Sequence, residues 1–396
     1  MRMSESLSSA SLLRSRDAHA HVRVTYVELF FDLIFVFAVT QLSHLLIEHL
    51  SFAGAFQTLL LLLAVWWAWI DTSWVTNWLD PDHIAVRGLL FGLMFLGLLL
   101  SASIPHAFDA EGLLFAITYA CMQIGRSSFM LWALRRHDNG NFRNFQRIAA
   151  WHVLIGVLWI GGALAQGPMR MAVWTLAVVL ECIAPSVGFW VAGLGRSSTA
   201  DWKVDGTHMA ERCALFIIIA LGESILVTGA TAAGVKATFE ANMAFTSAFL
   251  STVAMWWIYF NIGAERGSHR IASDTDPGRI ARATYTYAHV IIVAGIVATA
   301  VGDEIVLKHA HANVHLTEAA VLIAGPALYL VGNSFFKRAS AQHYPLSHLV
   351  GLALLAVIAI LSPLMTAMLL GATTTAVLIV VAAWETASWR SANRSA

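Results

Sequence analysis

Long apolar runs recur along this sequence from residue 28 to residue 387, and they restrict the folds that the chain can adopt. A helix of about 20 residues, rising about 1.5 Å per residue, crosses roughly 30 Å of hydrocarbon. The chain is 58% hydrophobic and only 12% charged, about half the charged share of a typical soluble domain. None of the runs alternates with the period of two that lipid-facing barrel strands show. The sequence therefore predicts an all-α, polytopic integral membrane protein.

Charged and proline-containing breaks divide the apolar sequence into about twelve predicted transmembrane helices. Asp80-Pro81-Asp82 separates the second span from the third. Ser362-Pro363 splits the last apolar run into two crossings, because proline lacks an amide hydrogen and interrupts a helix. The predicted spans are 28–49, 54–72, 85–104, 112–134, 148–166, 170–194, 210–231, 242–262, 282–304, 316–336, 346–361 and 365–387.

The distribution of positive charge predicts the orientation of these spans. If the N-terminus is cytoplasmic, most of the 24 Lys and Arg residues fall on the cytoplasmic side, and the outer side holds Arg170, Lys236 and Lys308. By the positive-inside rule we predict both termini in the cytoplasm. Residues 1–27 lack the apolar core of a signal peptide and are predicted to form a disordered cytoplasmic tail, with a second short tail at 389–396. A formal net charge of zero argues against a nucleic-acid partner and leaves the lipid bilayer as the expected surroundings.

The two halves of the sequence, 28–195 and 210–388, share motifs in the same order. Two six-helix repeats inserted in parallel would be related by an axis along the membrane normal, and the site of such proteins lies where the halves meet. In this alignment the ionisable residues are concentrated in the first half, because Asp71 and Arg126 are matched by amides. The matched pairs are Glu28 with Glu211, Trp66-Trp67 with Trp256-Trp257, Asp71 with Asn261, Tyr119 with Tyr329, Arg126 with Asn333, His152 with His348 and Pro168 with Pro363.

The first span carries polar residues on more than one side, which indicates a helix surrounded by other helices. Glu28 and Asp32 are one turn apart near its start, and Thr40, Gln41 and His44 lie deeper. A carboxylate inside a membrane costs at least ~2.5 kcal/mol, so it is normally paired, solvated in a cavity or functional. We therefore take these five residues as candidates for an ion pathway.

Asp32, Asp71 and Arg126 form a second candidate set. Asp32 and Asp71 are expected in the cytoplasmic third of the membrane and Arg126 near mid-depth. One interpretation is a structural ion pair, in which Asp32 or Asp71 neutralises Arg126. The other is a cation or proton site built from the two carboxylates. The sequence leaves both open.

The seventh span supplies the remaining candidates, Glu211, Arg212 and Glu223. Glu223 lies past the midplane, where a lone glutamate is either a proton carrier or a hydrogen-bonded contact between helices. Gly222 beside it suggests the close approach of another backbone. Glu181 in the sixth span allows the same two interpretations.

Two blocks of sequence resemble a known family. The first is Arg23 followed by Glu28-Leu-Phe-Phe-Asp32-Leu-Ile-Phe-Val-Phe-Ala-Val-Thr. The second is His208-Met-Ala-Glu211-Arg212 with Leu221-Gly222-Glu223-Ser224 after an apolar run. Together they resemble the bacterial low temperature requirement A (LtrA) membrane proteins. The resemblance implies a polytopic protein of a bacterial inner membrane and brings no settled reaction or substrate with it.

These features favour a proton- or cation-coupled transporter of an unknown small solute. One alternative is a cation channel, because Phe31-Asp32 and Thr40 resemble the first helix of the potassium channels with a Phe-Ser-Asp motif. Another is a lipid-related membrane enzyme or sensor linked to growth at low temperature. Homo-oligomerisation is left open.

Catalytic and metal-binding motifs are missing from the sequence. There is no Walker loop, Gly-x-Ser-x-Gly or His-Glu-x-x-His motif, so we expect neither enzymatic activity nor a cofactor. His309, His311 and His315 share an outer loop without an acidic or thiol ligand beside them. We therefore expect no metal site there.

Overall fold

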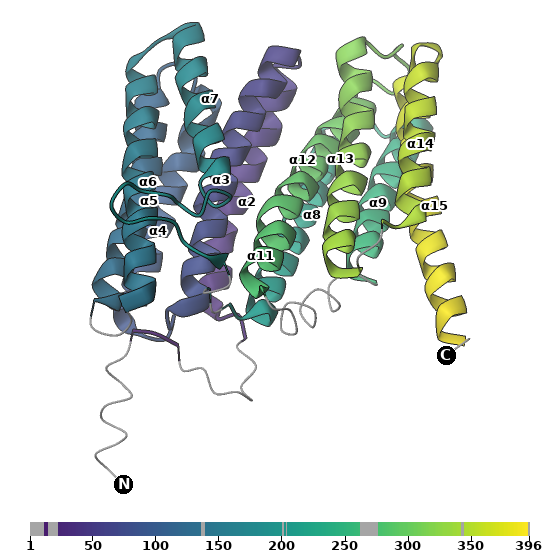
Figure 1. The fold of residues 1–396 in the computed structure, drawn as a ribbon. Helices are drawn as coiled ribbons and strands as arrows, with labels where there is room; N and C mark the ends of the chain where they lie inside the picture. Colours follow the sequence, from purple (N-terminus) through teal and green to yellow (C-terminus); the bar gives the residue numbers. More distant parts are fainter. Residues whose placement is uncertain are drawn as a thin grey trace. The chain divides into compact units, whose positions relative to one another are not determined.

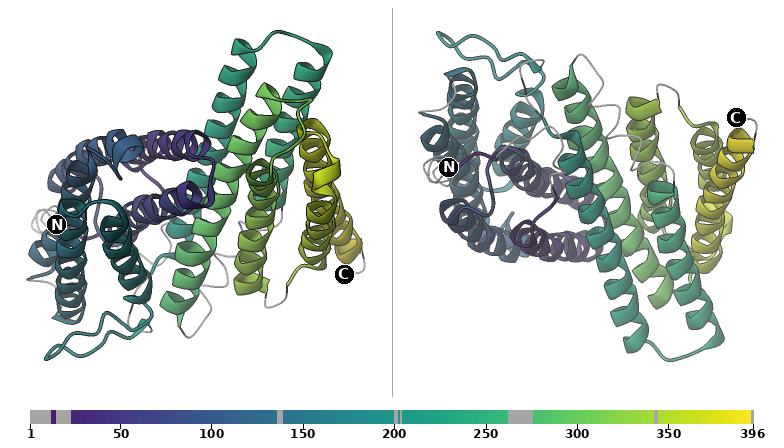
Figure 2. Two further views of the ribbon diagram at one scale, coloured as in Figure 1. Left: turned by 90° about the horizontal axis from the view of Figure 1, so that it is seen from above. Right: turned by 90° about the horizontal axis from the view of Figure 1, so that it is seen from below.

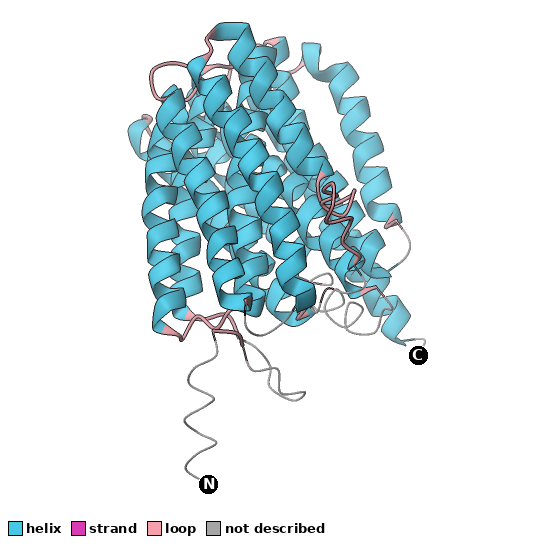
Figure 3. Ribbon diagram, turned by 60° about the vertical axis from the view of Figure 1, so that its left-hand side comes forward, coloured by secondary structure: helices cyan, strands magenta, loops and turns pink. Residues whose placement is uncertain are grey.

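The computed structural model describes residues 12–14, 23–135, 139–199, 202, 204–261, 276–341 and 344–394. In this part of the chain the regular structure is helical, and pairing between extended segments is limited to isolated bridges such as Leu13 with Leu79. Figures 1 and 3 show long helices, most of them joined by short loops. Helices suit a chain in lipid because each satisfies its own backbone hydrogen bonds.

The helices match the predicted apolar runs closely. Their bounds are α2 (Tyr26–Glu48), α3 (Phe52–Trp78), α4 (Ile84–Ser103), α5 (Gly112–Leu134), α6 (Asn139–Leu164), α7 (Gly167–Ile183), α8 (Gly206–Gly234), α9 (Phe239–Phe260), α11 (Pro277–Ala281), the π-helical segment η3 (Arg282–Ala288), α12 (His289–Lys308), α13 (Leu316–Ala341), α14 (Leu346–Leu361) and α15 (Ala367–Arg394). Among the described residues, ten helical segments are long and apolar enough to cross a membrane, α11, η3 and α12 counting as one. The chain is therefore a multi-pass membrane protein.

Some boundaries differ from the predictions for local reasons. The sixth predicted span, 170–194, is too long: α7 ends at Ile183, and backbone in the left-handed region follows at Gly188, Phe189, Gly193 and Gly195. Such conformations do not continue a right-handed helix. The break at Ser362-Pro363 is confirmed, since a short 3-10 turn (Ser362–Leu364) separates α14 from α15.

The predicted tails are more ordered than expected where the structure describes them. The backbone amide of Arg14 donates to the Trp78 carbonyl at 2.9 Å, and the Asp80 amide donates to the Leu12 carbonyl at 2.9 Å. Leu12 is buried in an apolar cluster with Leu79 and neighbours from α5 and α6. Residues 12–14 of the predicted disordered tail are thus held against the end of α3, while most of that tail lies outside the described residues. At the other end, α15 continues to Arg394.

The chain divides into two compact units. Unit 1 comprises residues 1–41, 60–211 and 276–278, and unit 2 comprises residues 42–59, 212–275 and 279–396. Helices α2, α3, α8 and α11 contribute residues to both.

In unit 1, aromatic rings fill the contacts between α5, α6 and α7 (blue to teal in Figure 1). Phe115, Trp159 and Trp174 are fully buried, and their ring centroids lie 4.9–5.7 Å apart. The indole of Trp174 donates to the Trp159 carbonyl at 2.9 Å. This packing fixes the mutual positions of three helices that carry polar side chains one or two turns away.

In unit 2, α12 packs on α13, α13 on α14 and α14 on α15, a row that runs from green to yellow in Figure 2. Glycines allow the closest of these contacts. A Cβ atom added at Gly295 would lie 2.5 Å from the Tyr329 backbone nitrogen, and one at Gly325 would lie 2.5 Å from Thr299 Oγ1. Small residues at such positions let membrane helices pack backbone to backbone.

Candidate functional site

A set of polar side chains from four helices meets inside unit 1, and we call it the unit 1 cluster. Residues 119, 123 and 126 follow the i, i+4, i+7 spacing that places side chains on one face of a helix. The cluster consists of Asp71 of α3, Tyr119, Gln123 and Arg126 of α5, His152 of α6 and Glu181 of α7.

Arg126 is the positive charge of the cluster. Its side chain is 1% exposed, and its Nη2 lies 3.0 Å from Asp71 Oδ2. Nη1 donates to the Ala68 carbonyl at 3.1 Å and to Thr72 Oγ1 at 3.0 Å, and Nη2 also donates to Gln123. Of the two predicted partners, Arg126 therefore pairs with Asp71.

Asp32 has a different environment. It is fully buried in α2 and accepts a hydrogen bond of 2.7 Å from the indole of Trp69. The indole donor fixes the orientation of this carboxylate.

Glu181 brings a second carboxylate to the cluster. It is 3% exposed and accepts a hydrogen bond of 2.5 Å from the Tyr119 hydroxyl. The amide nitrogen of Gln123 lies 2.8 Å from Glu181 Oε1 and 3.2 Å from Asp71 Oδ2. Gln123 therefore links the two carboxylates from α3 and α7.

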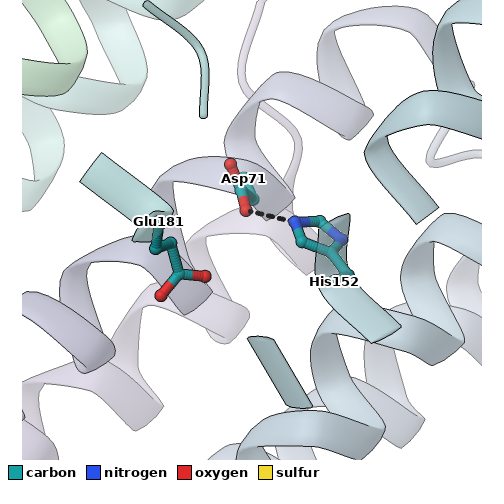
Figure 4. Close-up of side chains that lie close together, drawn as sticks. All are labelled: Asp71, His152 and Glu181. Atoms are coloured by element: carbon teal, nitrogen blue, oxygen red, sulfur yellow. Dashed lines mark ion pairs between the residues drawn. The ribbon is translucent and has the colours of Figure 1, made fainter. Parts of the chain in front are cut away.

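His152 completes the cluster. Figure 4 shows its ring facing Asp71, and Nε2 lies 3.4 Å from Asp71 Oδ2. Nδ1 lies 2.7 Å from the hydroxyl of Ser127, which is also 2.9 Å from the Gln123 carbonyl. Because a hydroxyl both donates and accepts, Ser127 can satisfy Nδ1 whether or not that nitrogen carries a proton.

The charges within the cluster do not balance when His152 is neutral. Two carboxylates, Asp71 and Glu181, face one guanidinium, and neither Arg126 nor Glu181 is more than 3% exposed. A buried charge without compensation is costly, so one further positive charge is needed. A proton supplies it, and so does a bound cation. The donor atoms of Asp71, His152 and Glu181 all lie within 4.8 Å of one another.

The starts of the two sequence blocks that carry the family resemblance meet in another part of unit 1. Glu28 is fully buried; its Oε1 lies 2.9 Å from His208 Nε2 and its Oε2 lies 3.1 Å from Arg14 Nη2. The backbone amide and the hydroxyl of Thr25 also donate to this carboxylate, each at 2.9 Å. Glu211 accepts from the Val24 amide at 3.1 Å. Glu28 is thus a neutralised connection between the N-terminal segment and the start of α8.

The remaining candidates lie further along α2 and on α8. Thr40 donates to the Val36 carbonyl within its own helix at 3.1 Å, Gln41 is half-buried and His44 is exposed. Arg212 and Glu223 are buried in α8.

The environment of Gly222 also differs from the expectation. A Cβ atom added there would meet no described atom within 4 Å, so the predicted close approach is not observed.

Unit 2 contains a charged cluster that the sequence alignment missed, formed by Lys337 of α13, His348 of α14 and Glu385 of α15. Lys337 Nζ lies 2.6 Å from Glu385 Oε2, and His348 Nδ1 lies 3.5 Å from Glu385 Oε1. The expectation that ionisable residues concentrate in the first half is therefore incorrect. The alignment matched Arg126 to Asn333, whereas the cation of unit 2 comes one turn later. The sequence did offer a signal for this cluster: Lys337 directly follows the predicted span 316–336, and Glu385 lies within the predicted span 365–387. Charged residues at such positions are rare and need a partner.

Comparison with known proteins places the chain in a family. The model of the bacterial low temperature requirement A protein (LtrA) matches residues 23–383. A curated relative, "Uncharacterized protein RA0937" of Rhizobium meliloti (strain 1021), is 40% identical over 374 residues, covering 94% of this chain and 91% of the relative. No solved structure matches the chain significantly. This chain, with both resembling blocks brought together at Glu28 and His208, belongs to the LtrA family.

Proposed function

We propose that this membrane protein is a proton-coupled transporter and that the unit 1 cluster carries the coupling proton. The observation that supports the proposal is the charge imbalance inside unit 1, where Asp71 and Glu181 face the single guanidinium of Arg126. Binding one proton makes this cluster neutral, and releasing it leaves a buried negative charge. Keeping the cluster buried therefore costs more free energy without the proton than with it. Such a difference lets proton binding shift the balance between two conformations, as a proton-coupled transporter requires.

Two hydroxyl groups support a proton that binds and leaves. Ser127 contacts His152 at 2.7 Å, and Tyr119 contacts Glu181 at 2.5 Å. Each hydroxyl can rotate between donating and accepting. His152 and Glu181 therefore keep a hydrogen-bond partner in both protonation states, while Asp71 stays paired with Arg126.

A divalent metal ion is the second candidate for the same site. Two carboxylates and an imidazole whose donor atoms lie within 4.8 Å form a ligand set that suits Zn²⁺ or Mn²⁺. The guanidinium 3.0 Å from Asp71 opposes a divalent ion, since the site would then carry excess positive charge. This comparison of charges favours the proton.

We also propose twelve crossings in two parallel six-helix repeats, with both termini in the cytoplasm. This adds α5 and α7 to the ten helical segments already identified as long and apolar enough to cross. The uneven distribution of Lys and Arg supports the orientation. Reaction of cysteines introduced at the two termini with an impermeant reagent tests it, since labelling from outside intact cells would contradict the proposal.

The experiment that tests the function measures proton flux in proteoliposomes. A pH gradient is imposed, an internal dye reports its decay, and solutes are added singly from a panel of sugars, amino acids, organic acids and cations. We expect at least one solute to accelerate the decay in wild type and not in Glu181→Gln. Glu48→Gln, at an exposed position at the end of α2, is the matched control and should behave as wild type.

Four outcomes would overturn the assignment. Equal decay for wild type and Glu181→Gln with every solute would refute proton coupling at this cluster. Single-channel currents in planar bilayers would favour the channel instead. A change in the lipid profile of cells on deletion of the gene, without any flux, would favour the lipid-related alternative. If Mn²⁺ or Zn²⁺ alone were transported, the metal would be the cargo.

A further inference from the structure

Lys337 in unit 2 is held as a bound cation would be. Its Nζ donates to Glu385 Oε2 at 2.6 Å, to Glu385 Oε1 at 2.8 Å and to the Ile258 carbonyl at 2.9 Å. The residue is 6% exposed. An ammonium group has three N–H donors, and oxygen atoms accept all three.

The unit 2 cluster repeats the construction of the unit 1 cluster. In unit 1, Arg126 of α5 donates to the carbonyl of Ala68, the third residue of Trp66-Trp67-Ala68 in α3. In unit 2, Lys337 of α13 donates to the carbonyl of Ile258, the third residue of Trp256-Trp257-Ile258 in α9. The cation therefore contacts the same motif position in both units.

The same correspondence holds for the histidine and for one acid. The helix after the cation supplies the histidine in both units, His152 in α6 and His348 in α14. The helix after that supplies a glutamate, Glu181 in α7 and Glu385 in α15. Unit 2 therefore contains a second site of the same plan, placed one turn away from where the sequence alignment put it.

The two clusters differ in charge. In unit 1 the position of Asp71 adds a second carboxylate, so one positive charge is missing. In unit 2 the matching position is Asn261, whose amide donates to the Thr386 hydroxyl at 3.3 Å. One ammonium then faces one carboxylate, and α9 contributes a carbonyl from Ile258 rather than a charge. The unit 2 cluster is neutral with a neutral His348.

We propose that the unit 2 cluster is a second cation site in which the tethered ammonium of Lys337 replaces an exchangeable ion. The chain then exchanges one proton, in unit 1, and unit 2 keeps a fixed charge. The role of this proton exchange in transport rests on the proposed function. The number of exchangeable protons per chain, however, is measured without a transport assay. Removing the ammonium should convert unit 2 into a second site for a proton.

Infrared difference spectroscopy of the purified full chain in nanodiscs tests this, because a protonated carboxyl group absorbs separately from a carboxylate. The wild type and Glu385→Gln should give the same carboxyl signal on titration, since the ammonium of Lys337 lies 2.6 Å from Glu385 Oε2. Lys337→Met, of similar length without the charge, should gain one protonated carboxyl per chain. The double variant Lys337→Met with Glu385→Gln should lose that gain, and Lys337→Arg should show none.

Each result decides the proposal. A carboxyl signal in wild type that disappears in Glu385→Gln would show an exchangeable proton in unit 2 and overturn it. A folded Lys337→Met without a new signal would also overturn it. If Lys337→Met does not fold, the comparison of wild type with the near-isosteric Glu385→Gln remains decisive. Loss of a signal in Glu181→Gln instead reports on unit 1, so failure of the proposed function is recognised separately.

Discussion

The ion pair between Arg126 and Asp71 allows a quantitative test of the unit 1 cluster. Arg126→Met removes the guanidinium and leaves Asp71 and Glu181 with a largely buried negative charge. Breaking a buried pair by removing one partner costs about 3–5 kcal/mol. Because the Asp71 side chain is 20% exposed, we expect the lower end, about 3 kcal/mol.

A double-mutant cycle isolates the interaction from the other contacts of each side chain. Arg126→Met, Asp71→Asn and the double variant are unfolded in mixed micelles of a mild detergent and dodecyl sulfate, and the free energy of unfolding is compared with wild type. We expect a coupling energy of about 2–3 kcal/mol. In that case the double variant is more stable than the sum of the single effects predicts.

The chain offers a matched control in the pair of Arg87 and Asp82. Their charged atoms are 2.6 Å apart, closer than the 3.0 Å of Arg126 and Asp71, but the side chains are 45% and 73% exposed. Water screens such a pair, so its coupling should stay below about 1 kcal/mol. If the buried pair coupled no more strongly than this control, burial would not set the strength of the interaction, and the charge argument for unit 1 would fail.

Two further substitutions test the short hydrogen bond at Glu181 and the closest helix contact of unit 2. Tyr119→Phe removes a hydrogen-bond donor 2.5 Å from the buried carboxyl group of Glu181. It should lower the free energy of unfolding by about 1.5–3 kcal/mol and shift the pH dependence of proton flux. An unchanged pH dependence would show that Tyr119 is not part of the proton site. Gly295→Ala places a Cβ atom 2.5 Å from the Tyr329 nitrogen and should cost about 1–3 kcal/mol in the same unfolding assay. Gly222→Ala, which meets no described atom within 4 Å, is the control and should be neutral or slightly stabilising; equal losses in both variants would refute the packing argument.

The sequence by itself determined which segments become helices. Runs such as 28–49 and 316–336 had to be helical, because backbone amides in hydrocarbon have no water to bond and a helix satisfies them locally. Ser362-Pro363 likewise fixed the break before α15. The cost of charge in lipid also marked Asp71, Arg126 and Glu181 as residues that need a reason to be there. These are local properties, and they can be read without knowing which helices become neighbours.

The tertiary structure alone decided which of these charges meet. Arg126 pairs with Asp71 while Asp32 accepts from Trp69, and Glu28 reaches His208 across 180 positions of sequence. In unit 2 the cation is Lys337, one turn beyond the residue that the repeat suggested. The periodicity of one helix fixes the face on which a side chain lies, but a partner is set by the rotation and depth of the neighbouring helix. Those depend on packing over many residues, so a shift of one turn changes the charge pattern of a site without changing any helix.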